Sequence, residues 1–382
     1  MKQIIKFELN KIFSQKGIYI AMLLLFSLFV LMLVNESRNI SPRLETKAYE
    51  IKEELRILAQ DWEGKLNEEK FNEASQTSDA LFDYSSSTSD LTHKETAELF
   101  ITESYIRNYN TKYKTIPERI NELDVVLNKS NKNEVAYKNA LQEKNMLNDL
   151  KLDTFQYNTG PKTTIDFVDS YSYFFTGIIL LIGLSPLFVK EATTGMDQLI
   201  YSSTHGRKKG VIAKLLASFI FLSFVILTWV TFDLLLVSYM YGNSGWSSPV
   251  QLLQYSLVYS PYSLTALQYF LIQIGTHFLA GIAFISLILL VSSLSKNLLV
   301  PFVTCGAIFI APIINIGSPF WEYVRKYSFS NFMKGPGLHE FNAVNVFGFS
   351  VLDPIFNVSL LILFSVALII FLYKTIQRKQ IS

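Results

Sequence analysis

The sequence predicts an all-α membrane protein with six transmembrane helices, an N-terminal interfacial helix and a helical, coiled-coil-like extracellular domain between spans one and two. Three observations support this prediction. Half of the 382 residues are apolar and 17% are charged, against roughly 25% in soluble proteins. The apolar residues gather in long charge-free runs, and a helix needs roughly 20 such residues to cross a bilayer. The Lys and Arg residues lie mostly on one side of these runs.

The same composition excludes several other classes of protein. So many apolar residues are not found in disordered or collagen-like chains, and a single cysteine, Cys305, cannot form an intramolecular disulfide. The net charge of +2 conceals an asymmetry, because residues 35–169 hold 18 basic and 25 acidic residues while the remainder is basic. This pattern indicates a membrane protein with a water-facing insert, and no nucleic-acid partner is expected.

Residues 1–17 are expected to form a cytoplasmic amphipathic helix that turns into span one, residues 18–34. The apolar residues of this segment share one face at helical spacing, and lysines are interspersed among them. The apolar set is Ile4, Ile5, Leu9, Ile12 and Phe13, and the lysines are Lys2, Lys6, Lys11 and Lys16. A cleaved signal peptide is disfavoured because the apolar run is long and no small-residue cleavage site follows it.

Five further apolar runs are expected to cross the membrane as helices, since a backbone in lipid must satisfy its own hydrogen bonds. They are residues 170–189, 215–241, 264–294, 298–316 and 354–373. Between spans three and four the chain is broken by Asn243, Gly245, Pro249 and Pro261. Residues 317–350 form a long aromatic outer loop, expected either to re-enter the outer leaflet or to lie flat with Trp321 and Tyr323 as interface anchors.

The distribution of Lys and Arg sets the expected orientation. Six spans place both termini on one side, where thirteen Lys and Arg residues fall, against three in the short loops opposite. The positive side is cytoplasmic. We therefore expect a multi-pass protein of a bacterial plasma membrane, with both termini and the tail 374–382 in the cytoplasm and residues 35–169 outside.

The extracellular insert, residues 35–169, has a heptad-like seam and helix-capping patterns. Apolar residues step by three and four in two stretches. The first is Leu44, Ala48, Ile51, Leu55, Leu58 and Trp62; the second is Ile116, Ile120, Leu123 and Leu127, continued with polar interruptions to Tyr137 and Leu141. Thr92 with Glu95 and Thr115 with Glu118 match capping boxes, and residues 75–90 read as a polar linker. The simplest packing is an antiparallel helical pair, which serves either to recognise cargo or a partner, or as a stalk with no ligand.

Motifs of catalysis are absent from the sequence. It has no phosphate-binding loop, so ATP hydrolysis is not expected in this chain. It also lacks zinc-protease and nucleophile-elbow motifs, and its four histidines are far apart. We expect no enzyme activity, no catalytic residues, no metal and no cofactor in this chain.

Two polar residues within the spans are candidates for lining a transport path. His277 is expected either to relay protons or, as the favoured alternative, to be a neutral imidazole bonded to a neighbouring helix. Asp233 lies toward the outer part of span three, where it either lines a path or pairs with a cation, or, as favoured, sits at headgroup level.

The cytoplasmic segment 190–214 is unusually rich in charge for a turn between spans. It contains Glu191 and Asp197 and a basic cluster at 207–209. Its layout resembles that of permease subunits of type-2 ATP-binding-cassette (ABC) transporters, in which a Glu-x3-Gly motif is followed by an aliphatic pair, a Ser/Thr turn, Arg and Lys. The matching residues are Glu191, Gly195, Leu199, Ile200, Ser202, Arg207 and Lys214. Six spans, an interfacial helix and a large outer insert agree with the resemblance.

The resemblance implies that segment 190–214 is a coupling helix that docks on a separate ABC ATPase, present in two copies and holding ATP and Mg. A second permease copy, identical or a sister chain, would pair with this one among membrane lipids. The implied coupling residues are Glu191, Gly195, Asp197, Leu199, Ser202, Arg207, Lys208 and Lys214. The alternative is that the basic cluster only sets topology and contacts anionic lipid.

The function expected from this resemblance is export of a hydrophobic or amphipathic compound, such as a peptide antibiotic, a lipid or a drug. Export of such a peptide would confer antimicrobial peptide resistance. The alternative function is a membrane-anchored receptor or assembly scaffold whose helical outer domain binds a partner. An intramembrane enzyme is disfavoured because no catalytic constellation falls within the spans.

Overall fold

The computed structural model describes residues 1–36, 51–87, 91–132, 134–203, 206–346 and 349–379. It is 79% helical, which confirms the expectation of a mostly helical protein. The predicted all-α class needs one correction, because the structure also contains two short antiparallel strand pairs. β1 (Gly64–Lys65) pairs with β2 (Thr154–Phe155), and β3 (Ala343–Val346) pairs with β4 (Phe349–Leu352).

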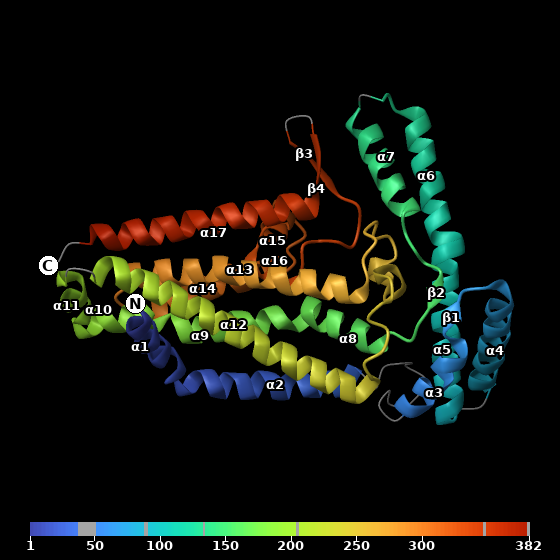
Figure 1. Cartoon of the computed structure of the whole chain (residues 1–382), viewed down its shortest axis with the longest axis horizontal. Coiled ribbons are helices and arrows are strands. Elements are labelled where there is room, and N and C mark those ends of the chain that lie inside the picture. The colour runs from blue at the N-terminus through green and yellow to red at the C-terminus, as the bar shows by residue number, and fades with distance from the viewer. Residues whose placement is uncertain (37–50, 88–90, 133, 204–205, 347–348, 380–382) are drawn as a thin grey trace.

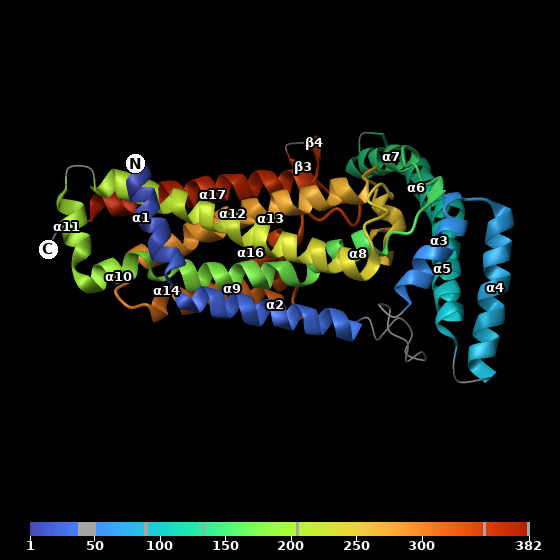
Figure 2. The same ribbon diagram turned by 60° about the horizontal axis from the view of Figure 1, so that its bottom comes forward.

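Long helices lie side by side along the longest axis of the molecule (Figures 1 and 2). They are α2 (Lys16–Glu36), the run formed by α8 (Thr159–Phe167), η2 (Val168–Ser172), α9 (Tyr173–Leu184) and α10 (Pro186–Thr194), then α12 (Gly206–Tyr241), α13 (Ala266–Leu294), α14 (Leu299–Ile310) and α17 (Asp353–Arg378). α1 (Lys2–Phe13) meets α2 at a bend of 57°. Both termini lie at the same end of this bundle, together with α10 and α11 (Met196–Ser202) (Figure 1).

Four helical segments among the described residues are long and apolar enough to cross a membrane: Thr159–Thr194, Gly206–Tyr241, Ala266–Leu294 and Asp353–Arg378. The bent pair α1 and α2 qualifies as a fifth crossing if it is counted as one span. Leu299–Ile313, which includes η5 (Ala311–Ile313), is apolar but shorter. At 1.5 Å per residue it is roughly 22 Å long, less than the roughly 30 Å hydrocarbon core. The structure therefore confirms several apolar helices that are long enough to cross a membrane, and the count of six spans remains a prediction.

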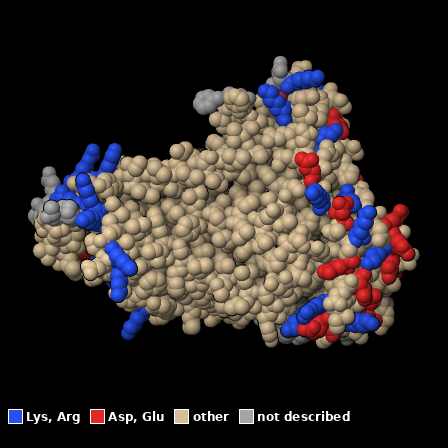
Figure 3. All heavy atoms as spheres, viewed as in Figure 1, with Lys and Arg blue, Asp and Glu red and all other residues tan. Residues whose placement is uncertain are grey.

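The charged side chains divide the molecule into three zones (Figure 3). Lys and Arg, with few carboxylates, gather at the end that carries the two termini. The middle of the visible face is almost free of charge, and the opposite end shows both signs. This order is the one expected of a bundle whose middle lies in lipid, because charged groups avoid the hydrocarbon core.

Several helices extend beyond the apolar runs that the sequence defines. The second span begins at Thr159 rather than 170, so the outer domain ends earlier than 169. The third begins at Gly206 rather than 215, and the last reaches Arg378 rather than 373. The physical reason is that hydropathy marks only the apolar part of a helix, whereas the hydrogen-bonded backbone continues through polar residues into the interfacial region.

The bundle is closely packed around aromatic side chains and glycines. Trp229, Phe221 and Phe284 are fully buried. A Cβ on Gly177 would lie 2.5 Å from the ring of Phe309, and a Cβ on Gly160 would lie 2.5 Å from the carbonyl oxygen of Gly242. Small residues let helices approach closely, which is how helices in membranes gain packing energy.

A helical domain, named the outer domain here after its predicted side of the membrane, stands across the end of the bundle opposite the termini (Figures 1 and 2). Its helices are α3 (Lys52–Trp62), α4 (Glu68–Ser87), α5 (His93–Asn110), α6 (Ile116–Lys129) and α7 (Val135–Asn148), and the π-turn η1 (Thr111–Thr115) joins α5 to α6. One buried cluster contains Trp62, Tyr105 and Phe155, and a second contains Leu123 and Leu147. The domain is thus a group of several helices, more elaborate than the expected antiparallel pair.

Three sequence predictions about this domain are corrected. The polar linker 75–90 is helical as far as Ser87, because Phe71 and Ala74 hold α4 against α5 and the polar residues that follow continue the same helix. The seam from Ile116 to Leu141 is interrupted after α6, and α7 folds back beside α6 as a hairpin. Thr92 and Glu95 form the predicted capping box, whereas Thr115 has helical dihedrals inside a continuous helix and caps nothing. Leu44 and Ala48 lie outside the described residues.

Residues 317–350 contain two short helices, and both arrangements expected for this segment relative to the membrane remain predictions. α15 (Pro319–Lys326) has no buried residue, and Phe320 and Tyr323 are exposed. α16 (Phe329–Lys334) packs on α13 and buries Phe329 and Met333. The connection before α13 contains two short 3-10 turns, η3 (Val250–Leu252) and η4 (Tyr255–Leu257). These segments cover the end of the bundle opposite the termini (Figure 1).

We predict that Gly160→Ala lowers the free energy of unfolding by about 1–3 kcal/mol, because the new methyl group meets the Gly242 carbonyl oxygen, part of a backbone that cannot easily move. The matched control is Gly275→Ala in α13, whose Cβ meets nothing within 4 Å. Thermal unfolding of both variants in lipid nanodiscs checks this. Equal effects of the two substitutions would contradict the close packing of α8 on the end of α12.

Candidate functional site

The charged segment between the second and third predicted spans folds as a short helix across the end of the bundle. α10 ends at Gly195, whose φ of +68° is left-handed, and α11 follows at once. A residue with a side chain would be strained at this φ, whereas glycine adopts it freely. The turn aims α11 across the bundle axis (Figure 2). The predicted loop 190–214 is therefore mostly helical, with α12 beginning at Gly206.

A buried charge cluster lies directly behind this turn, made of Glu8, Lys11, Glu191 and Lys214. The Nζ atom of Lys214 lies 2.6 Å from Oε1 of Glu191 and 2.9 Å from Oε2 of Glu8. The Nζ atom of Lys11 lies 2.6 Å from the same Glu191 oxygen and 3.4 Å from Oε1 of Glu8. Two ammonium groups thus face two carboxylates, and the cluster has no net charge.

The charge cluster joins three segments that are distant in sequence. Glu8 and Lys11 come from α1, Glu191 from α10 and Lys214 from α12. Glu8, Glu191 and Lys214 are each at most 4% exposed. Loss of one partner from a buried ion pair leaves an uncompensated charge and costs about 3–5 kcal/mol. The cluster therefore fixes the position of α1 relative to the α10–α11 turn.

The structure separates the eight predicted coupling residues into two groups. Glu191 and Lys214 are brought together, but they are buried and contact α1, so they do not form part of an exposed docking surface in this structure. Arg207 is half-buried, and its Nη1 donates to the carbonyl oxygen of Gln377 at 3.3 Å. These three residues hold the segment in place, and the expectation that they themselves touch a partner is not supported by their burial.

The remaining predicted residues face outward or lie at the surface. Leu199 is 73% exposed, and Ser202 and Lys208 are also exposed. Ser202 donates its hydroxyl to the carbonyl oxygen of Leu199 at 2.9 Å. Asp197 is half-buried, and its Oδ1 accepts from the backbone N–H of Gln198 at 2.9 Å. With Gly195 exposed at the turn, α11 presents an apolar side chain in polar surroundings at the Lys/Arg-rich end of the molecule.

The inner side of α11 rests on the C-terminal end of the chain. Tyr201 is 9% exposed, and the Nζ atom of Lys379 lies 5.8 Å from the centre of its ring. Burial, together with the nearby carboxylates of Glu191 and Asp197, raises the pKa of Tyr201, so the phenol is neutral. Burial also lowers the pKa of Lys379. One side of α11 thus packs near the C-terminal end of the chain through Tyr201, while the opposite side, with Leu199, is exposed.

Glu8 and Lys11 are functional candidates that the sequence analysis did not identify. Glu8 follows Ile4 by four residues and precedes Ile12 by four, so it lies on the apolar face of α1. A carboxylate on such a face needs a buried cation, and this pattern was the available signal. The position of its partner, 206 residues away, was not encoded in any local pattern.

His277 is a fully buried, hydrogen-bonded imidazole, which agrees with the favoured alternative. Its Nδ1 lies 2.7 Å from the carbonyl oxygen of Met333, and its Nε2 lies 2.8 Å from Oγ1 of Thr176. A carbonyl only accepts, so Nδ1 holds the proton and Nε2 accepts from Thr176. Thr176 in turn accepts from Trp229 Nε1 at 3.2 Å. The chain of bonds fastens α16 to α9, α12 and α13.

Asp233 is also fully buried, within the packing of α12. Neither of its carboxylate oxygens has a hydrogen-bond partner among the described residues. Its full burial shows that this side chain packs inside the bundle, and the expected depth at headgroup level remains a prediction. The inward orientation follows from the position of Asp233 four residues after Trp229, on the same buried stripe.

The described residues contain no group of three or more His, Cys, Asp or Glu side chains that could hold a metal ion. Comparison of the chain with family models, with curated proteins and with solved structures found no match. The functional argument therefore depends on the geometry of the charge cluster and of α11.

We predict that Lys214→Met lowers the free energy of unfolding by about 3–5 kcal/mol, because Glu8 and Glu191 would remain buried without their shared cation. The matched control is Lys209→Met, which removes an exposed ammonium from the same helix. Thermal unfolding in nanodiscs gives the comparison. Glu8→Gln combined with Lys214→Met should recover part of the loss, and equal stability of the two single variants would refute the cluster's role.

Proposed function

We propose that this chain is the permease subunit of an ABC transporter that exports a hydrophobic or amphipathic compound, such as a peptide antibiotic, a lipid or a drug. A separate ATPase subunit, present in two copies, would supply the energy and hold ATP and Mg. The observation that supports this most is α11, an exposed helix with an apolar side chain at its centre, fixed from behind by a buried charge cluster.

The connections of α11 suit the transmission of force. Its N-terminus follows α10 at Gly195, and α10 ends the helical run Thr159–Thr194. After its C-terminus the chain enters α12, whose 36 residues extend about 54 Å at 1.5 Å per residue. A push on α11 would therefore reach two long helices and, through Glu8 and Lys11, the interfacial helix α1. A second copy of the permease would complete the transport path.

The orientation that we propose places α11 and both termini in the cytoplasm of a bacterial cell and the helical domain outside. The Lys/Arg-rich end in Figure 3 supports this, since positive residues favour the cytoplasmic side.

Labelling of single cysteines checks the orientation in a Cys305→Ser background. We predict that a membrane-impermeant maleimide labels Lys132→Cys in intact cells, and labels Ser202→Cys only after the membrane is opened, because both positions are exposed but at opposite ends. Labelling of Ser202→Cys in intact cells would contradict the proposed orientation.

A photo-crosslinking experiment tests the partner. We predict that p-benzoylphenylalanine in place of Leu199, which is 73% exposed, captures a protein with a Gly-x4-Gly-Lys-Ser/Thr loop in cells that naturally make this chain. The matched control places the same group at Tyr239, which is 76% exposed near the other end of α12. Capture of such an ATPase from Tyr239, or from neither position, would count against the proposal.

The alternative function, a membrane-anchored receptor or scaffold, has one observation in its favour. A cavity of about 520 Å³ lies on the outer domain, lined by Arg107 of α5 and by Tyr255 and Tyr259 of the facing loop. A receptor of this kind would need no ATPase under α11. Failure of the Leu199 crosslink, together with capture of an extracellular partner by the outer domain, would favour this alternative.

A further inference from the structure

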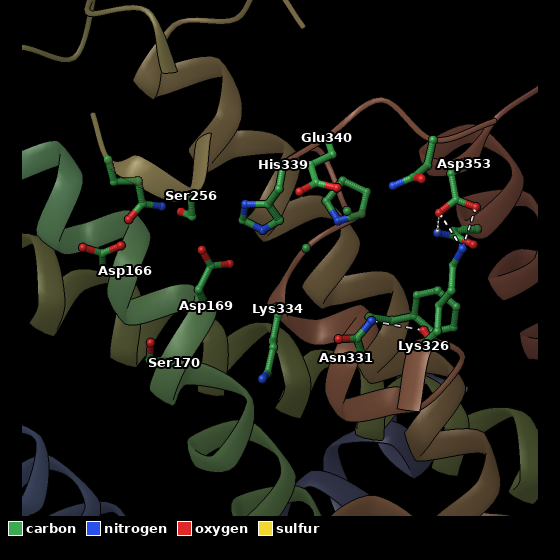
Figure 4. A pocket seen from close by; sticks show the side chains of 17 residues that line it. Asp166, Asp169, Ser170, Ser256, Lys326, Asn331, Lys334, His339, Glu340 and Asp353 are labelled. Carbon is green, nitrogen blue, oxygen red and sulfur yellow. Dashed lines mark hydrogen bonds and ion pairs between the residues drawn. The ribbon is translucent and has the colours of Figure 1, made fainter. Parts of the chain in front are cut away.

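A polar cavity of about 630 Å³ lies at the outer end of the helical bundle. In Figure 4, Asp166 and Asp169 from the α8–η2 run occupy one side, and Asp353 and Lys326 occupy the other. Lys334, His339 and Glu340 lie between them. A cavity of this volume is within the range of small-molecule sites.

The charged groups of the cavity favour a positively charged ligand. Four carboxylates line it against two ammonium groups. Both ammonium groups are already engaged: Nζ of Lys326 lies 2.9 Å from Oδ2 of Asp353, and Nζ of Lys334 lies 4.7 Å from the ring centre of Tyr173. Asp353 shares the ion pair with Lys326, and Oδ1 of Asp169 accepts from Nε2 of Gln273 at 2.9 Å, yet carboxylates still outnumber ammonium groups around the cavity by four to two.

The side chain of Asn357 indicates independently that a hydrogen-bond donor is missing beside the cavity. Its side chain lines the cavity although the residue is 5% exposed. The Nδ2 group donates to Oδ2 of Asp353 at 3.4 Å, while Oδ1 has no hydrogen-bond partner among the described residues. A buried acceptor without a donor is unfavourable by about 1–3 kcal/mol. An ammonium group would satisfy this oxygen, which is buried beside the cavity, after a small rotation of the amide toward it.

An apolar groove of about 350 Å³ adjoins the polar cavity. The ring of Phe332 in α16 lines both spaces. α17 also contributes to both along one stripe: Asp353 and Asn357 line the cavity, and Leu361 and Phe364 line the groove. The groove opens on a lipid-facing surface, since Ile308 and Phe364 are 43% and 46% exposed.

We propose that the cavity and groove together form a binding site for an amphiphile with an ammonium head group and a hydrocarbon chain. The head group lies among the carboxylates and Asn357, and the chain lies in the groove between α14, α16 and α17. Entry is lateral, from the outer leaflet. This assignment rests on the proposed function in that it names the class of compound an exporter would handle, but binding itself requires no ATPase.

Binding of tritiated dodecylamine to the full chain in phosphatidylcholine nanodiscs tests the site. We expect saturable binding of one molecule per chain, displaced by unlabelled dodecylamine and at least tenfold more weakly by laurate, which has the same chain length and the opposite charge. Asn357→Leu should weaken binding about tenfold, because an acceptor for a charged donor is lost. Leu360→Trp, which fills the groove, should weaken it as well.

Two matched variants on α17 complete the design. Ser359→Leu and Leu363→Trp change exposed positions that line neither space, and both should bind dodecylamine as the unsubstituted chain does. Non-saturable uptake that is equal for all variants would mean partition into lipid only and would overturn the site. Equal affinity for laurate would overturn the assigned charge. The dodecylamine binding assay contains no ATPase, so its outcome does not depend on the proposed function. If the Leu199 crosslink failed while dodecylamine still bound, the proposed function would be refuted and the binding site would stand.

Discussion

The position of one ammonium group, that of Lys214, constrains the whole Lys/Arg-rich end of the molecule. It lies between the carboxylates of Glu8 and Glu191, almost entirely out of contact with solvent. A buried charge is tolerated only when its partners are held at hydrogen-bonding distance. These distances hold only if α1, the end of α10 before Gly195 and the start of α12 keep fixed positions relative to one another. The intact cluster adds little net stability, but loss of any one of its charges leaves another buried without a partner and is costly.

The two ends of the bundle contrast in how they treat charge. At the Lys/Arg-rich end the buried charges neutralise one another, and the exposed helix α11 is what remains available to a partner. At the outer end, acceptors exceed donors around the cavity between α8–η2 and α17, and Asn357 keeps an unused oxygen. Between these ends lies an almost uncharged zone (Figure 3), where α17 is the least buried of the four long candidate spans. The end with matched charges suits mechanical connection, and the end with unmatched acceptors suits binding.

Sequence reasoning predicted the elements that depend on local pattern. Apolar runs located the long helices, the Thr92 capping box was confirmed, and Glu191 and Lys214 were selected before their contact was known. The features that sequence reasoning missed depend on contacts between residues that are far apart in the chain. The pairing of Glu8 with Lys214 joins residues far apart in the chain, and the break between α6 and α7 replaces a seam that local spacing would continue. The full burial of Asp233 was not predicted either, because hydropathy gives depth along a helix but not the side on which a neighbour packs.

A side-chain-resolution cryo-electron microscopy map of the chain, isolated in mild detergent from cells that naturally make it, would test the central claim most directly. The account predicts density that joins Lys214 to Glu8 and Glu191, and a nucleotide-binding subunit seated over Leu199 of α11. A map in which an intact assembly leaves α11 bare, or in which Lys214 points away from both carboxylates, would contradict it.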